Sequence, residues 1–97
     1  MDNELSEAIV AYLQRGKAPS PRADAKAVRS IALSDPGELV ARVTALVEES
    51  VAVPVDWSTL SLGDAGRAAA AEMARRHPEL SQEALDALSW NFTFQWR

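Results

Sequence analysis

The stretch SDPGELVARVTALVEE, Ser34 to Glu49, carries the clearest helical signal in the chain and decides its fold class. Asp35 can cap a helix whose first residue is Pro36, and Glu38, three residues after the cap, completes a capping box. The apolar residues that follow recur at helical spacing: Leu39, Val43, Leu46 and Val47. Such a stripe is typical of a helix that buries one face, so we predict a helix that ends at about Glu49.

Before this helix, the pattern indicates another one from Asn3 to Arg15. Its apolar residues share one face: Leu5, Ile9, Tyr12 and Leu13. Gly16 supplies a stop, because glycine readily takes the left-handed conformation at which many helices end.

A second, shorter helix is expected between these two. In the connection KAPSPRA, Ser20 can serve as its N-cap and Pro21 as its first helical residue. It should run to about Leu33. Four apolar residues should be buried by it: Ala25, Val28, Ile31 and Ala32.

After Ser50 the chain reads VAVPV, residues 51–55, in which valines alternate and Pro54 excludes a helix interior. We predict an extended segment there. A fourth helix should follow from about Asp64 to Arg76. Its buried face is made by Ala65, Ala69 and Met73, and it is small enough for a neighbouring helix to approach closely.

Ser81 is the expected N-cap of a fifth helix, with Leu80 and Leu85 forming a hydrophobic staple around it. This helix should end at about Leu88 or Ser89. The chain then closes in WNFTFQWR, residues 90–97, where four of its six aromatic residues alternate with polar ones.

Alternation with a period of two predicts a strand, and a strand needs a partner for its backbone groups. In the favoured interpretation, residues 51–55 and 90–96 form a minimal two-stranded element that closes the core over Trp57. In a second, the free edge of that strand, or Trp96, binds another protein. In a third, the fifth helix continues, with Trp90 and Phe94 on its buried face. All three place Trp90 in the core.

The composition bounds the class of protein. A chain of 97 residues is expected to form one domain, residues 1–97. With 47% hydrophobic and 25% charged residues it should be globular, not disordered. The sequence shows neither a basic signal-peptide start nor an apolar run of about 20 residues, so we expect a cytoplasmic protein with no membrane partner.

No sequence pattern indicates a catalytic, metal or cofactor site, and we expect a protein that is not an enzyme. Cysteine is absent, so no thiolate can hold zinc or attack a substrate. The single histidine, His77, precedes a proline at a helix end and is interpreted as a residue that suits the helix dipole. Glu48 and Glu49 are adjacent on a helix and point in different directions, so they cannot face one substrate atom together.

Basic residues gather in the second predicted helix, where Arg22, Lys26 and Arg29 recur at spacings of four and three and should share one side. They are the alternative site, suited to a regulatory or nucleic-acid-associated module. A helix-turn-helix would place the third helix in the major groove. That helix carries several glutamates with Arg42 as its only basic residue, and repulsion from phosphates therefore disfavours nucleic acid as a partner.

Acidic residues recur at spacings of four and three along the fifth predicted helix, and the net charge is -4. We expect them to meet basic residues of a protein partner, although a solvated helix face gives the same pattern. The candidate partner-binding residues are Glu48, Glu49, Glu79, Glu83, Asp86 and Trp96.

The ending LSQEALDALSWNFTFQWR, Leu80 to Arg97, resembles the C-termini of small bacterial proteins that finish with an alternating aromatic motif and a last Arg or Lys. Some of these are associated with immunity proteins of bacterial toxin systems. The resemblance implies a non-catalytic protein that binds and neutralises a cognate toxin. With the acidic residues above, it makes a basic toxin domain the expected partner. Taken together, we expect a mainly helical, compact bundle of about five helices that acts as an immunity-type inhibitor.

Overall fold

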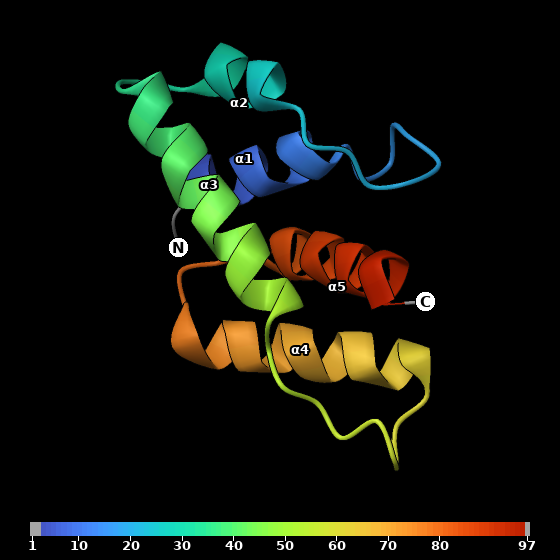
Figure 1. Cartoon of the computed structure of the whole chain (residues 1–97). Helices are drawn as coiled ribbons and strands as arrows, with labels where there is room; N and C mark the ends of the chain where they lie inside the picture. The colour runs from blue at the N-terminus through green and yellow to red at the C-terminus, as the bar shows by residue number, and fades with distance from the viewer. Residues whose placement is uncertain (1–2, 97) are drawn as a thin grey trace.

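The computed structural model describes residues 3–96, and this part of the chain is built from five helices and their connections (Figure 1). The mainly helical prediction is confirmed. The helices are α1 (Asn3–Leu13), α2 (Ala25–Ile31), α3 (Pro36–Val51), α4 (Leu62–Arg76) and α5 (Gln82–Trp96).

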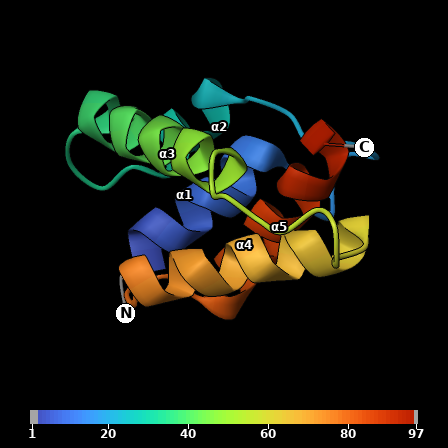
Figure 2. The same cartoon turned by 60° about the horizontal axis from the view of Figure 1, so that its bottom comes forward.

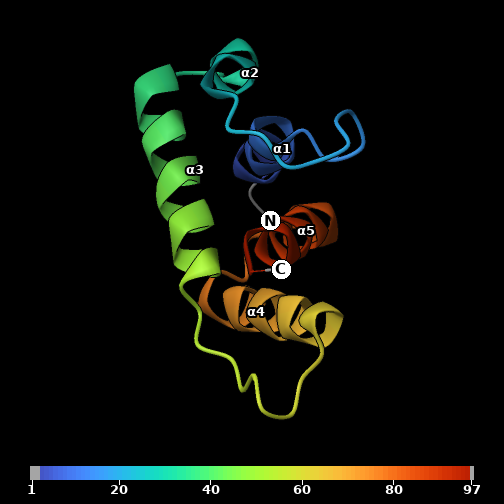
Figure 3. The same cartoon turned by 45° about the vertical axis from the view of Figure 1, so that its right-hand side comes forward.

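Helix α1 contacts α2, α3 and α5. Figure 3 shows it nearly end-on between α2 and α5, with α3 along one side. In Figure 2, α4 runs along the lower edge and α3 along the upper left, with α1 between them. Helices α4 and α5 lie side by side in opposite directions and form the most extensive contact in the described chain.

One cluster of buried apolar residues joins all five helices. Its largest fully buried members include Leu5 and Ile9 of α1, Val43 of α3, Met73 of α4 and Phe92 of α5. Because every helix contributes to the same core, the position of α1 relative to α5 is set by packing on both sides of α1.

Helix starts follow the cap residues. The Asp35 carboxylate accepts a hydrogen bond from the backbone N–H of Glu38 at 3.0 Å, and the Ser81 hydroxyl accepts one from Ala84 at 3.2 Å. Both predicted caps are therefore confirmed. The fourth helix starts slightly earlier than expected because Ser61, and not a later residue, caps it.

The predicted start of the second helix was wrong. Helix α2 begins at Ala25 and not at Pro21, because Asp24, and not Ser20, is its N-cap and accepts from the backbone of Ala27 at 3.1 Å. The segment before it runs alongside the end of α1, where the Arg22 N–H donates to the Leu13 carbonyl at 3.1 Å. These backbone bonds to α1 replace the helical turn that the sequence suggested.

The two-stranded element predicted from residues 51–55 and 90–96 was also wrong. Helix α5 continues to Trp96, as the third interpretation held, and α3 includes Val51. In a helix, alternate aromatics fall into two pairs four residues apart, so Phe92 pairs with Trp96 and Trp90 with Phe94. Each pair can pack without a neighbouring strand. The final residue of the motif, Arg97, lies outside the described residues.

The predicted close approach of a neighbour to α4 is confirmed. Ala65, Ala69 and Met73 are buried, and Gly66 between them faces α5. A Cβ atom at Gly66 would lie 2.6 Å from the Thr93 methyl carbon and 3.0 Å from the Ser89 hydroxyl. The two helices therefore meet at a distance that only a glycine permits.

Candidate functional site

The acidic residues predicted to bind a partner fall into two groups and one separate residue, Glu48. Glu49, at the end of α3, bonds within the chain: one carboxylate oxygen lies 3.0 Å from an Arg76 nitrogen and the other 2.9 Å from Nε2 of His77. Glu79 lies on the other side of the imidazole, 3.9 Å from Nδ1. Glu72 completes the cluster by binding Arg76 through Nε at 2.7 Å.

The arginines of this cluster lower the pKa of two of its carboxylates, Glu49 and Glu72. The hydrogen bond from Arg76 lowers the pKa of Glu49 below its ordinary value. Hydrogen bonds from Arg75 and Arg76 lower the pKa of Glu72 to about 2. The cluster therefore joins the end of α3 to the end of α4, and His77 stays a helix-end residue as expected, with Glu49 used inside the protein.

The second group lies on the first turns of α5 and is exposed. Asp86 accepts a hydrogen bond from the Gln82 side chain at 2.9 Å. Glu83 forms no ion pair and no side-chain hydrogen bond within residues 3–96. Of the acidic stripe, Glu83 is thus the carboxylate most open to a partner.

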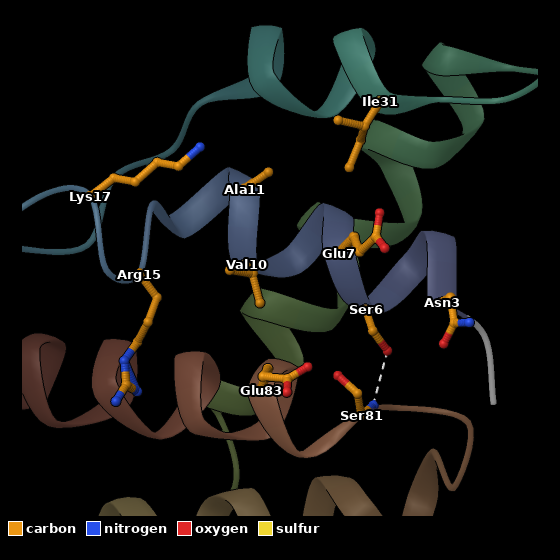
Figure 4. Close-up of a pocket in the computed structure, with 10 residues that line it drawn as sticks. All are labelled: Asn3, Ser6, Glu7, Val10, Ala11, Arg15, Lys17, Ile31, Ser81 and Glu83. Carbon is orange, nitrogen blue, oxygen red and sulfur yellow. Dashed lines mark hydrogen bonds between the residues drawn. The ribbon is translucent and has the colours of Figure 1, made fainter.

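Glu83 belongs to a groove of about 370 Å³ that the sequence did not reveal (Figure 4). The outward face of α1 forms its floor, and α2 and α5 form its sides, whereas α3 covers the opposite side of α1 (Figures 3 and 4). The residues that line it are Asn3, Ser6, Glu7, Val10, Ala11, Arg15, Lys17, Ile31, Ser81 and Glu83.

Polar contacts fix α1 and α5 to each other at both ends of this groove. At the start, the buried Ser6 hydroxyl accepts a hydrogen bond from the Ser81 N–H at 2.9 Å. At the other end, Arg15 donates to the Asp86 carbonyl at 2.9 Å and its guanidinium carbon lies 6.0 Å from the centre of the Trp90 ring. The groove is therefore held in shape before anything binds in it.

The charges of the groove are unequally placed. Glu7 and Glu83 lie near the N-terminal ends of α1 and α5, and Arg15 and Lys17 lie at the far end (Figure 4). Like Glu83, Glu7 makes no ion pair or side-chain hydrogen bond in the described range 3–96. Two exposed carboxylates thus stand at one end of a partly apolar surface.

Glu48 lies elsewhere, in a second groove of about 390 Å³ between α1, α3 and α5. Arg22 lines the same groove, so a basic and an acidic candidate residue share it. The predicted basic face was wrong in one member: Lys26 and Arg29 lie on α2 and are exposed, but Arg22 precedes that helix. A charged partner at the second groove would therefore be attracted by one of these two residues and repelled by the other.

The aromatic residues at the end of α5 form a cluster with Trp57. The Trp57 ring stacks on Phe92 at a centroid distance of 6.0 Å and lies 5.9 Å from Trp96. The Trp96 indole N–H donates to the Val51 carbonyl at 3.0 Å. Trp57 is 45% and Trp96 51% exposed, so Trp57 covers the core from outside, and not from beneath as predicted.

Trp90, which every interpretation placed in the core, is half-buried and packs against it. Phe92 is the aromatic residue that is fully buried on α5. The register of a helix explains this exchange, because Phe92 and Trp90 point to nearly opposite sides of it.

The groove residues Glu7, Arg15 and Lys17 lie outside the buried stripes from which the helices were predicted, so those stripes did not indicate them. Asn3, Glu7 and Val10 also recur at spacings of four and three, which places them on one face of α1. This second stripe is the one feature of the sequence that could have indicated the groove face of α1. Its pairing with Glu83 depends on the contact between α1 and α5 and is not visible in the sequence.

No protein-family model matches the chain, and no similar curated protein or solved structure was found. Within residues 3–96, no helix has both the length and the apolar character that crossing a membrane requires. In the same range, no three side chains among His, Cys, Asp and Glu gather in a way that could hold a metal ion.

Proposed function

We propose that this chain is a non-catalytic, cytoplasmic binding protein that captures and neutralises a basic protein partner, in the manner of an immunity-type inhibitor of a toxin. The observation that carries this proposal is the pair of exposed carboxylates, Glu7 and Glu83, beside the partly apolar groove on α1. Both lack a partner among residues 3–96.

Charge and shape support binding at this surface for different reasons. Exposed carboxylates on a chain of net charge -4 attract a basic partner and speed its approach. The apolar side chains of Val10, Ala11 and Ile31 offer area that a partner can bury, which supplies affinity. A groove that is already held in shape loses little entropy when it is filled.

The proposal revises the set of partner-binding residues. Glu83 and Asp86 keep that role, and Glu7 joins them. Glu49 and Glu79 lie in the cluster around His77, in which Glu49 joins the end of α3 to the end of α4. Glu48 and Trp96 lie outside the groove and serve as comparison positions.

The proposal is tested with the products of the reading frames next to the gene for this chain. Each product is expressed alone and with the chain, and cell growth is followed. We expect one product to arrest growth, the chain to restore it, and the two proteins to purify as a complex. Absence of rescue together with absence of a complex would contradict the proposal.

Charge reversal then locates the surface. In the complex, Glu83→Lys and Glu7→Lys should each weaken binding, measured by calorimetry, by about fivefold or more, since attraction becomes repulsion. Glu48→Lys makes the same change of charge outside the groove and should leave the affinity within about twofold. The reverse order of effects would place the binding surface at the second groove.

The alternative, a regulatory or nucleic-acid-associated module, rests on Lys26 and Arg29, which are exposed on α2. It has less support because α2 spans only seven residues and Arg22 lies off it. Salt-dependent binding of DNA or RNA, seen as a gel mobility shift, would favour this alternative over the inhibitor if it disappears when Arg22, Lys26 and Arg29 are replaced by neutral residues.

A further inference from the structure

The groove on α1 has two charged ends and not one. Glu7 and Glu83 lie at the end where α1 and α5 begin, whereas Arg15 and Lys17 lie at the other (Figure 4). Val10 and Ala11 lie between the two ends. A purely basic partner segment would be attracted at one end and repelled at the other, so the groove selects for a segment with charges of both signs.

The length of the groove suits a helix. Glu7 lies six residues before the end of α1, which corresponds to about 9 Å along the helix axis. Arg15 follows just beyond that end. Two side chains seven residues apart on another helix are separated by about 10 Å, so they can reach both charged ends at once.

The form of the floor suits a helix as well. The outward stripe of α1 presents the small side chains of Val10 and Ala11, and the sides are α2, through Ile31, and α5, through Glu83. An elongated, partly apolar groove between two helices is a common binding site for an amphipathic helix. Small residues on the floor permit close approach of the incoming helix.

Arg15 is positioned in advance for an anion. Its guanidinium donates one hydrogen bond to the Asp86 carbonyl and lies near the face of Trp90, while the side chain stays exposed. A guanidinium has five N–H donors, so others are left for a carboxylate from a partner. Fixing this cation before binding lowers the entropy cost of pairing.

We infer that the groove binds an amphipathic helix of the partner that carries a lysine or arginine opposite Glu7 and Glu83 and, about two turns away, an aspartate or glutamate opposite Arg15 and Lys17. The inference rests on the proposed function, since the helix belongs to the protein that the chain captures.

Three synthetic helical peptides of about 18 residues, long enough to hold a helix, provide the probe. They share one leucine and alanine face and differ at two positions seven residues apart, which hold lysine and glutamate, two lysines, or two glutamates. Binding to the full chain is followed by NMR through the amide signals of Val10, Ala11 and Ile31. The mixed peptide should bind about fivefold more tightly than either of the others, the most that one exposed ion pair usually contributes.

Variants of the chain should then reverse the order. Lys17→Glu makes the far end less basic, and the peptide with two lysines should gain relative to the mixed one. Glu83→Lys should favour the peptide with two glutamates. Glu48→Lys, the matched reversal outside the groove, should leave the order unchanged.

The inference is overturned if the three peptides bind alike, if none binds, or if the signals that shift are the indole N–H groups of Trp57 and Trp96 instead of those of the groove. A complex with the neighbouring gene product, combined with such a result, would leave the proposed function standing and remove only the helix-in-groove site. The expected peptide order without any protein complex would keep the groove and remove the inhibitor.

Discussion

The two halves of α5 make contacts of different kinds. The buried face of residues 82–89 is made of small and aliphatic side chains, of which Ala84, Ala87 and Leu88 are fully buried. Residues 90–96 carry four aromatic rings, of which only Phe92 is fully buried.

The two halves of α5 therefore differ in role: one stabilises the fold, and the other presents charged residues to solvent. In the first half, close packing against α1 and α4 leaves the outward positions to Glu83 and Asp86, whose carboxylates face solvent and form no ion pair with an arginine of the described chain. In the second half, the rings cover the segment after α3, and Trp96 is bonded to Val51. The aromatic ending therefore serves mainly the fold, whereas the aliphatic half presents the free charges.

The largest effect is expected in the aromatic half. Phe92→Ala should lower the free energy of unfolding by about 3 to 5 kcal/mol, because it leaves a cavity in the core beneath Trp57. Phe94→Ala, the same change at a half-buried position of the same helix, should cost clearly less. Urea denaturation measures both, and equal losses would contradict the register of α5.

The next largest effect on stability is expected where α4 meets the boundary between the two halves of α5, at Ser89 and Thr93. Gly66→Ala should destabilise the protein by about 2 kcal/mol, because its Cβ atom would lie 2.6 Å from a methyl carbon of Thr93. Gly63→Ala on the same helix meets only the end of the Arg67 side chain at 3.8 Å. That control should be neutral or stabilising by up to about 1 kcal/mol in thermal unfolding, owing to the helix propensity of alanine.

The outer ring pair should contribute less. Trp96→Phe keeps an aromatic ring but removes the indole donor to the Val51 carbonyl, and we expect a loss below about 1 kcal/mol, since the bond is exposed. Hydrogen exchange should rise in residues 52–61 and stay unchanged in residues 82–89. Faster exchange in both segments would show that the two halves of α5 are not independent.

Acid should weaken the cluster that joins α3 to α4. The pKa of Glu72 is about 2 in the folded protein, below its ordinary value of 4.5. The folded state therefore gains stability above pH 4.5 from this group and loses it as the pH falls toward 2. Glu72→Gln should flatten that loss when urea denaturation is repeated over this pH range. An equal loss in the variant and the unchanged protein would contradict the contribution of Glu72.

The smallest effect on stability is expected at the groove. Glu83→Lys removes a favourable charge from the first turn of α5 and should cost less than about 1 kcal/mol in urea denaturation. Glu7→Lys lies in the second turn of α1 and should cost still less. A larger loss at either position would mean that these carboxylates serve the fold, and would remove them from the binding surface.

Local features of the sequence were sufficient for most of the helices. Asp35 and Ser81 start helices because a side-chain oxygen meets a backbone N–H only three residues away. The small face of α4 was also readable, because Ala65, Ala69 and Met73 recur at helical spacing.

The aromatic ending was not decided by local features. Alternate rings fit one face of a strand, and they fit two pairs on a helix equally well. Contacts with Trp57 and with the Val51 carbonyl, which lie far away in the sequence, belong to the helical solution. The same holds for α2, whose start moved because the preceding segment bonds to the end of α1.

By itself the sequence determined the helical class, most caps and the acidic balance, because these depend on residues within one or two turns of each other. Only the tertiary structure decided which acids are free. It joined Glu49 to Arg76, 27 residues away, and brought Glu7 and Glu83 to the same groove through the packing of α1 on α5. The sequence shows which residues are charged. Whether a carboxylate is paired inside the protein or exposed to a partner depends on which helices the core brings together.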